Sequence, residues 1–333
     1  MIRIETSVAF DRPLTFVVLI SAAILDFAMG DPWGCPHPVQ LMGWVIQRYT
    51  KGALRWWNEP WQLRLAGIHL AIALVCSVSL GSWLLFYGLD QRAWPVSLCL
   101  EVVLLASCFA GRSLHDATVD VLKPLAVGDV TVARSRLRRY VGRDTDTLAE
   151  QDILRALLET VAENTTDGVM APLFYALVGI AIPVVGPVPL ALAYKAVSTL
   201  DSMIGYREEP YQHLGWFSAR LDDVLTWLPC RLMVLTVGLL SGKLKSVWVI
   251  GWRDARKDPS PNSGWSECAY AAILGVQLGG QNWYRGMAKF KPLLGNPRQR
   301  ITTQHIELAT RLTRNCFLLW LGLASLGVGL VSP

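Results

Sequence analysis

The feature that most constrains this chain is a series of apolar runs. A transmembrane helix needs about 20 consecutive, mostly apolar residues. Six runs reach or approach that length, at 14–29, 65–89, 95–110, 169–192, 224–240 and 317–331. Charged residues make up 17% of the 333 residues, whereas soluble domains carry roughly 25%. We therefore predict an all-α fold class, a polytopic helical integral membrane protein with helical polar loops.

The first run, 14–29, is open to a second interpretation. Arg3 and Arg12 precede it, as positive residues precede the apolar part of a signal peptide. However, Met29 stands where a cleavage site needs a small residue. We expect an uncleaved first helix.

Positive charge is concentrated in two segments that flank apolar runs. Residues 284–314 contain seven Lys or Arg and one acid, and residues 241–260 contain five Lys or Arg and two acids. Lys and Arg collect in cytoplasmic loops, so both segments should face the cytoplasm. Topology explains these clusters, and no nucleic-acid partner is expected.

Familiar signatures of soluble enzymes and metal sites are missing. The seven cysteines are scattered without a C-x-x-C pair, which argues against both a disulfide framework and zinc. The chain has no phosphate-loop motif, no G-x-G-x-x-G after a strand and no H-E-x-x-H. Any nucleotide would have to be bound in a non-standard way.

We interpret residues 1–333 as a single membrane domain, with a polar helical segment at 111–168 inserted between spans. In that segment Asp129 can cap a helix that ends at Gly142. Residues 147–150 fit a capping box for a second helix, which would bury a stripe at 154, 157, 158 and 161. Strand signals are missing, because no period-two alternation is sustained and no Asn-Gly turn occurs.

The run beginning at residue 169 has two possible topologies. Residues 169–200 include four prolines, at 172, 183, 187 and 189. The segment is either one kinked span or a re-entrant pair, since irregular backbone is tolerated at membrane depth where protein satisfies it. The positive-inside rule prefers one span, whereas a shared active site prefers the pair.

Polar side chains next to apolar spans are expensive to keep there and are usually functional. The first group is Asp26, Asp31 and His37, the latter two in the run GDPWGCPHPV. A capped interfacial turn explains that group equally well. In the second group, Glu159 and Glu163 share one helical face with Asp152, opposite the leucine stripe. That periodicity favours a merely solvated face.

The second group nevertheless continues toward the membrane edge through Asn164 and Asp167. Several carboxylates converging there would suit Mg²⁺, which prefers oxygen ligands.

Three further groups follow along the chain. Lys195 and Asp201 sit among apolar residues, where snorkelling explains the lysine more easily than the aspartate. Arg220 and Asp223 are three residues apart and can pair on a helix. Asn262 belongs to a Ser-Pro-Asn loop signal that would otherwise indicate a surface turn.

Taken in order, these segments resemble the CbiB/CobD family of cobalamin biosynthesis membrane proteins. The matching motifs are GDP…PHPV, VAEN..DGV.APLF, YKA.STLDSMIGY, RLDD…P.R and SPN.G…LGV.LGG, from Asp26 to about Gly286. Departures from the family pattern are Gln40 for Arg, Asp258 for His, Ser266 for Pro and Cys268 for Ala. The departure at 258 puts a specific role for that position in doubt.

The resemblance implies an amide-forming ligase with ATP and Mg²⁺ as cofactors and a corrinoid as substrate. Family members are taken to join adenosylcobyric acid to (R)-1-amino-2-propanol O-phosphate, giving adenosylcobinamide phosphate. The expected location is the bacterial inner membrane, with several spans and a cytoplasmic active site. Besides the lipid bilayer, other cobalamin-pathway enzymes or further copies of the chain are candidate partners, although no residue pattern shows them.

Residue type suggests roles within that reaction. Candidate catalytic residues are Asp31, His37, Glu159, Glu163 and Asp201. Candidate substrate-binding residues are Asp26, Asn164, Lys195, Arg220, Asp223 and Asn262. Candidate metal ligands are Glu159, Glu163 and Asp167. The alternative function is a non-catalytic corrinoid-binding or transport protein, because transporters also carry intramembrane Asp and Lys residues.

Overall fold

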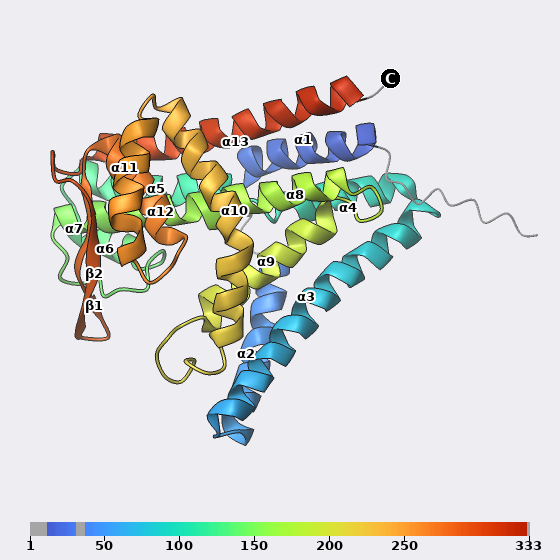
Figure 1. Cartoon of the computed structure of the whole chain (residues 1–333), viewed down its shortest axis with the longest axis horizontal. Coiled ribbons are helices and arrows are strands. Elements are labelled where there is room, and N and C mark those ends of the chain that lie inside the picture. The colour runs from blue at the N-terminus through green and yellow to red at the C-terminus, as the bar shows by residue number, and fades with distance from the viewer. Residues whose placement is uncertain (1–11, 31–36, 332–333) are drawn as a thin grey trace, which may run out of the picture. The chain divides into compact units, whose positions relative to one another are not determined.

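The computed structural model describes residues 12–30 and 37–331, and the chain divides into two compact units. Unit 1 comprises Met1–Ala110, Ala171–Leu225 and Leu321–Pro333. Unit 2 comprises Gly111–Met170 and Thr226–Trp320. Figure 1 colours the elements of both units along the chain. The predicted polar segment 111–168 lies in unit 2.

The regular elements of unit 1 in the described part of the chain are helices, and α9 packs against most of them. Its helices are α1 (Arg12–Met29), α2 (Pro38–Trp56), α3 (Pro60–Asp90), α4 (Trp94–Ala106), α8 (Ala171–Ala181) and α9 (Pro187–Ile204). Helix α9 packs against α2, α3, α4 and α8, whereas α1 packs mainly against α4. The division between the units falls within α10 (Trp216–Leu240) and within α13 (Thr303–Val331).

Three helices in the described part of the chain are long and apolar enough to cross a membrane. They are Pro60–Asp90, Trp94–Ala126 and Trp216–Leu240, and Leu14–Met29 is a shorter apolar helix. The second of these is α4 continued by α5 (Gly111–Ala126), with a short break between them. These findings confirm the predicted all-α membrane protein.

The proline-rich segment forms a helical hairpin and not one kinked span. Helices α8 and α9 are joined by a short turn and pack extensively against each other. Gly179 permits this approach, because a Cβ there would overlap the carbonyl oxygen of Gly186. Pro187 and Pro189 begin α9, where a missing N–H costs nothing. The prolines therefore separate and start helices.

Unit 2 combines short helices with one β-hairpin. Besides α5, its elements are α6 (Val130–Leu137), α7 (Glu150–Asn164), the π-helix η1 (Thr165–Met170), α11 (Leu244–Asp254), the 3₁₀-helix η2 (Ala255–Lys257), α12 (Ser263–Leu274), β1 (Gln277–Tyr284) and β2 (Met287–Gly295). Helix α12 packs against α7 and α11. Helix α12 is therefore the centre of this unit.

The two helices predicted in the polar segment are present, with differences at their ends. The Asp129 side chain caps α6 by accepting a hydrogen bond from the Val132 N–H, as predicted. However, α6 ends at Leu137, before Gly142. The predicted stripe at 154, 157, 158 and 161 is buried on α7. The capping box at 147–150 is wrong, because Ala149 occupies the N-cap in extended backbone and offers no side-chain acceptor.

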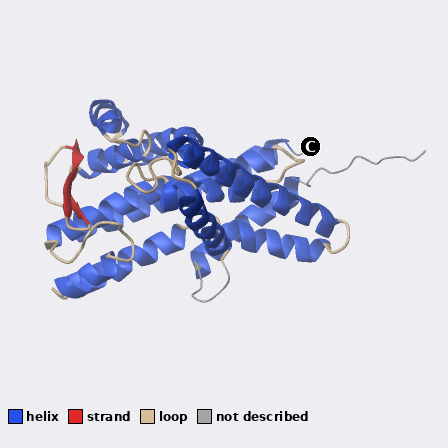
Figure 2. Cartoon of the chain, turned by 90° about the horizontal axis from the view of Figure 1, so that it is seen from below, coloured by secondary structure: helices blue, strands red, loops and turns tan. Residues whose placement is uncertain are grey.

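The predicted absence of strands is also wrong. Strands β1 and β2 pair antiparallel. Figure 2 shows this hairpin in red. Arg285 and Gly286 connect them, both with positive φ (52° and 76°), as the two-residue turns that suit hairpin twist require. Arg-Gly is a less familiar turn signal than Asn-Gly. A register irregularity between Leu278 and Gly280 interrupts the alternation that would otherwise indicate a strand.

Close helix packing in unit 1 yields a stability prediction. A methyl group at Gly67 of α3 would overlap the carbonyl oxygen of Leu214, whereas Gly81 of the same helix has nothing within 4 Å of an added Cβ. Gly67→Ala should cost about 1–3 kcal/mol through overpacking. Gly81→Ala should leave stability unchanged or raise it slightly, since alanine favours a helix. Thermal unfolding in detergent measures both, and equal midpoints would contradict the packing.

Candidate functional site

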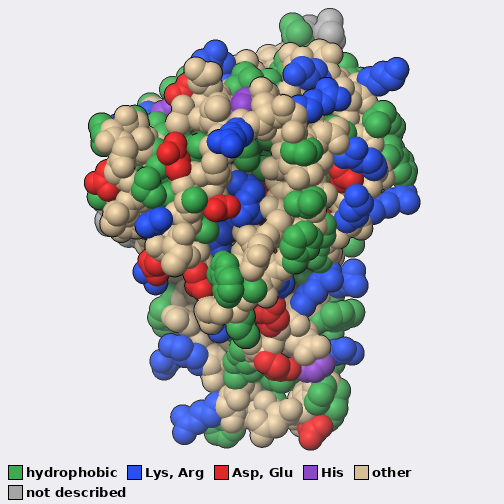
Figure 3. All heavy atoms as spheres, turned by 90° about the vertical axis from the view of Figure 1, so that its left-hand side faces the viewer, with side chains coloured by type: hydrophobic (Ala, Val, Ile, Leu, Met, Phe, Trp, Pro, Cys, Tyr) green, Lys and Arg blue, Asp and Glu red, His purple; other side chains and the backbone are tan. Residues whose placement is uncertain are grey.

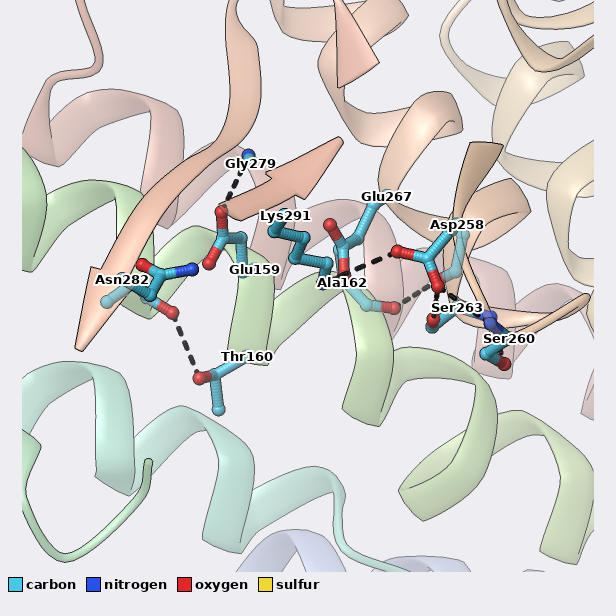
Figure 4. A network of polar contacts seen from close by, with 12 residues as sticks. Glu159, Thr160, Ala162, Asp258, Ser260, Ser263, Glu267, Gly279, Asn282 and Lys291 are labelled. Atoms are coloured by element: carbon cyan, nitrogen blue, oxygen red, sulfur yellow. Dashed lines mark hydrogen bonds and ion pairs between the residues drawn. The ribbon is translucent and has the colours of Figure 1, made fainter. Parts of the chain in front are cut away.

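A cluster of charged side chains surrounds Lys291 of β2. The Lys291 Nζ lies 2.5 Å from Oε1 of Glu267 and 3.8 Å from Oδ2 of Asp258. Glu159 and Glu163 of α7 also act on it electrostatically. Figure 4 shows Lys291 reaching between Glu159 on one side and Glu267 and Asp258 on the other. We call these five residues the Lys291 cluster.

Glu267 is the most deeply buried carboxyl of the cluster. It lies in α12 with 0% of its surface exposed, and its Oε2 has no hydrogen-bond partner. Burial raises the pKa of this carboxyl to about 8, because desolvation and the neighbouring Glu159 and Glu163 outweigh the attraction of Lys291. A carboxyl whose pKa lies near neutrality can both accept and return a proton.

Glu163 is the accessible carboxylate of the cluster. Its side chain is exposed to solvent. Surrounding protein nevertheless raises the pKa of Glu163 by desolvation, with Lys291 opposing and Asp258 adding to the shift. Glu163 therefore combines access to solvent with a desolvated carboxyl. The predicted solvated face holds for the exposed Glu163 but is wrong for Glu159, which is 2% exposed.

Glu159 is held by cations and by a backbone N–H. Its Oε2 accepts a hydrogen bond from Arg143 at 2.5 Å, and its Oε1 accepts one from the Gly279 N–H at 2.8 Å. Arg155 lies 3.6 Å from Oε1 and also donates to the Gly279 carbonyl. Arg143 further donates to Asn282 at 2.9 Å. Glu159 therefore joins α7 to β1.

The Ser-Pro-Asn loop positions Asp258. The Asp258 Oδ1 accepts hydrogen bonds from the Ser260 N–H at 2.9 Å and from the Ser263 hydroxyl at 3.1 Å. Its Oδ2 is buried without a hydrogen-bond partner. Arg231 of α10 donates to Oδ1 of Asn262 at 2.6 Å and to the Pro261 carbonyl at 2.8 Å. The loop is therefore a fixed support of the cluster, and Asn262 is 4% exposed within it.

The other predicted residues of unit 2 lie beside the cluster. Asn164 ends α7 and donates to the Thr160 carbonyl at 2.9 Å. Asp167 is half-buried in the π-helix η1, where Thr166 donates to Ser266 of α12 at 3.3 Å. Single π-helical turns are rare and occur frequently at functional sites. Asn164 therefore closes α7 directly after Glu163, and Asp167 lies in the π-helical turn that follows.

The remaining predicted residues lie in unit 1. Asp26 is buried at 3% exposure on α1, and His37 caps α2 by accepting from the Val39 N–H, as the turn interpretation predicted. Asp31 falls outside the described residues.

Helix α9 carries two of the others, Lys195 and Asp201, both half-buried. The Asp201 carbonyl accepts the Gly205 N–H at 2.7 Å. Arg220 and Asp223 approach to 4.0 Å, which confirms their local pairing.

The predicted magnesium ligands Glu159, Glu163 and Asp167 do not form a metal cage. In residues 12–30 and 37–331, no group of three or more His, Cys, Asp or Glu side chains could hold a metal ion. The physical reason is that Arg143 and Lys291 stand where a divalent cation would neutralise these carboxylates. The structure therefore gives no support to this set as a preformed site.

Sequence reasoning did not select Glu267, Lys291 or Arg143, and it left Asp258 without a role. One signal was available for Lys291, because Ala288, Lys289, Phe290 and Lys291 alternate as strand residues do. Glu267 had a weaker signal, as a carboxyl inside an otherwise apolar helix. Arg143 gave none, since only the fold brings it to Glu159.

The fold and site together define a helical membrane protein with a buried charged cluster in a separate polar unit. Comparison with known proteins identifies the family. The model of the CobD/Cbib protein family matches residues 19–313. The chain therefore belongs to the CobD/CbiB family.

Three relatives illustrate this similarity. The cobalamin biosynthesis protein CobD of Synechocystis sp. is 51% identical and covers 92% of this chain and 90% of its own length. The CobD of Halalkalibacterium halodurans is 41% identical, covering 87% and 89%. The cobalamin biosynthesis protein CbiB of Salmonella typhimurium is 40% identical, covering 90% and 93%. No solved structure matches the chain.

The buried Glu159 ion pair yields a second stability prediction. Glu159→Gln leaves Arg143 buried beside a neutral partner, which should cost about 3–5 kcal/mol. Asp152→Asn removes the other carboxylate that pairs with Arg155, but Asp152 is 43% exposed, so the cost should stay below about 1 kcal/mol. Unfolding of both variants in detergent tests this order, and similar losses would show that Glu159 is not the buried anchor.

The raised pKa of Glu267 predicts a pH dependence of stability. Between about pH 4.5 and 8 the unfolded chain releases this proton while the folded chain retains it. The folded state then binds more protons, so the free energy of unfolding should fall as the pH rises through this window. Glu267→Gln should flatten that fall when unfolding is measured at pH 5 and at pH 8.5. An unchanged slope would mean that Glu267 does not titrate there.

Proposed function

We propose that this chain acts in cobalamin biosynthesis as an ATP-dependent amide ligase. In this reaction a propionate carboxylate of adenosylcobyric acid condenses with the amine of (R)-1-amino-2-propanol O-phosphate. The product is adenosylcobinamide phosphate. Family membership supports the pathway, and the Lys291 cluster supports the chemistry.

The cluster carries the proposal because amide formation needs controlled proton transfer. A carboxylate is a poor acyl donor and must first be activated, for example as an acyl phosphate formed from ATP. The attacking amine is protonated at neutral pH and must lose a proton before its lone pair can form the C–N bond. A carboxylate whose pKa is raised by desolvation, as that of Glu163 is, is a stronger base for that proton than an ordinary carboxylate.

We assign the residues of the cluster to separate tasks. Glu163 is exposed, binds the incoming ammonium group as an ion pair and accepts its proton. Lys291 keeps a positive charge between Glu163 and the buried Glu267. Glu159, Arg143 and Asp258 fix this arrangement by holding β1, α7 and the Ser-Pro-Asn loop.

Magnesium fits this site only as an ion that arrives with the nucleotide. Mg²⁺ on ATP phosphates needs one or two protein carboxylates and not a complete protein cage. Glu163 offers one accessible carboxylate for such an ion. When bound, Mg²⁺ would neutralise phosphate charge.

The proposal also includes a location. Candidate spans and the basic segments 241–260 and 284–314 support an inner-membrane protein with a cytoplasmic site. The Lys291 cluster contains residues 258, 267 and 291, which lie within or between these basic segments.

A reconstituted assay tests the proposed function. The purified protein would receive adenosylcobyric acid, aminopropanol phosphate and Mg-ATP, with each omitted in turn, and mass spectrometry would detect the amide. Glu163→Ala should lower the rate at least about 100-fold, the usual scale for a positioned acid–base group. Glu150→Ala, an exposed change on the same helix, should leave it unchanged.

Two results would count against the proposal. A corrinoid that binds without gaining the aminopropanol arm would indicate the transport or carrier alternative. An amide formed at the normal rate by Glu163→Ala would move catalysis away from the Lys291 cluster.

A further inference from the structure

Helix α11 presents a stripe of aromatic and basic side chains to the surroundings. The stripe comprises Lys245, Trp248, Val249, Trp252 and Arg256, with Arg256 in η2 directly after the helix. Trp248, Val249 and Trp252 are 44%, 56% and 47% exposed, and both basic residues are exposed. Spacings of three, four and seven residues place them along one side of a helix. We call this set the α11 stripe.

The opposite side of α11 is fully engaged in unit 2. Val247, Ile250, Gly251 and Asp254 are buried, and α11 packs against α12. Gly251 faces Trp265 so closely that a Cβ would overlap the indole ring. Apolar residues on the buried side explain the fold of this helix, but they do not explain two tryptophans on its exposed side.

The tryptophans of the stripe pack against the rest of unit 2. Trp248 and Trp252 each contact the buried Trp265, with ring centroids 5.8 and 5.9 Å apart. The Arg256 guanidinium lies over the Trp252 ring at 4.6 Å. In the stripe, therefore, cations border aromatic rings that are packed against the protein. Figure 3 shows Lys and Arg side chains next to hydrophobic ones on one face of the molecule.

The position of α11 in the chain points to the occupant of this surface. Helix α10 is a candidate membrane span, and its last residues Leu239 and Leu240 are 64% and 41% exposed. Helix α11 begins four residues later, after a turn at Gly242 in which φ is 67°. A Cβ added at Gly238 would lie 3.0 Å from Cδ1 of Leu244, so the end of α10 and the start of α11 lie together. The stripe thus follows directly after a candidate membrane span.

We propose that the α11 stripe binds the headgroup layer of a membrane rich in anionic phospholipid. Tryptophan is enriched where membrane meets water, and an amphipathic helix with basic residues lies in that layer. Lys245 and Arg256, at the two ends of the stripe, face lipid phosphates, while Trp248, Val249 and Trp252 enter the acyl boundary. This role is independent of the ligase activity.

A fluorescent reporter on the full-length protein tests the proposal. A bimane group is attached at Val249→Cys after Cys35, Cys76 and Cys99 are replaced by serine, and the protein is reconstituted in nanodiscs of phosphatidylcholine with phosphatidylglycerol. Lipids with a nitroxide on the headgroup should quench this bimane strongly. Bimane at Ser135→Cys, exposed on the polar helix α6, is the matched control and should be quenched far less.

The charged residues provide the second arm of the experiment. Nitroxide phosphatidylglycerol should quench the Val249→Cys bimane more than nitroxide phosphatidylcholine does. Lys245→Gln with Arg256→Gln should reduce that preference at least about tenfold, given the usual attraction of each basic residue to an anionic leaflet. Circular dichroism confirms that each variant keeps its helices.

The remaining outcomes overturn the proposal. Equal quenching by the two lipids would remove the anionic preference. A bimane shielded from aqueous iodide but not quenched by lipid would show that another protein or a second copy covers the stripe. A bimane open to iodide and not quenched by lipid would show that the stripe faces water.

Discussion

The burial of an ammonium group among four carboxylates is the interaction on which unit 2 depends. A buried charge without a partner is very unfavourable, and several carboxylates close together would repel one another. Lys291 offsets both costs, because its ammonium group lies 2.5 Å from Glu267. It also attracts Glu159, Asp258 and Glu163 electrostatically. Its own pKa is raised, since these anions outweigh the effect of desolvation in this compact group.

This constraint links parts of the chain that are far apart in sequence. Lys291 can reach the carboxylates because β2 pairs with β1, and β1 is held to α7 through Gly279 and Glu159. Arg231 holds the loop that precedes α12. The burial of Glu267 lowers stability as the pH rises, because folding keeps its carboxyl protonated up to about pH 8.

The sequence predicted a large part of the fold because local signals were sufficient there. Apolar length identified the candidate spans, and the Asp129 cap and the leucine stripe identified α6 and α7. Glu159 and Glu163 were selected because several carboxylates converge there and the motif resembles the family. Their partners were not selected, since Arg143, Asp258, Glu267 and Lys291 come from other elements. The hairpin was missed because a bulge near Gly280 disrupts the period-two pattern.

By itself, therefore, the sequence determined that the chain is a helical membrane protein and which family it resembles. These properties depend on composition, on periodicity and on motifs read along the chain. The tertiary structure decided that the proline-rich segment is a hairpin, that Glu159 forms ion pairs with arginines and that Glu267 is buried beside Lys291. Such properties depend on distances and desolvation between residues up to 132 positions apart, from Glu159 to Lys291, and no local pattern encodes them.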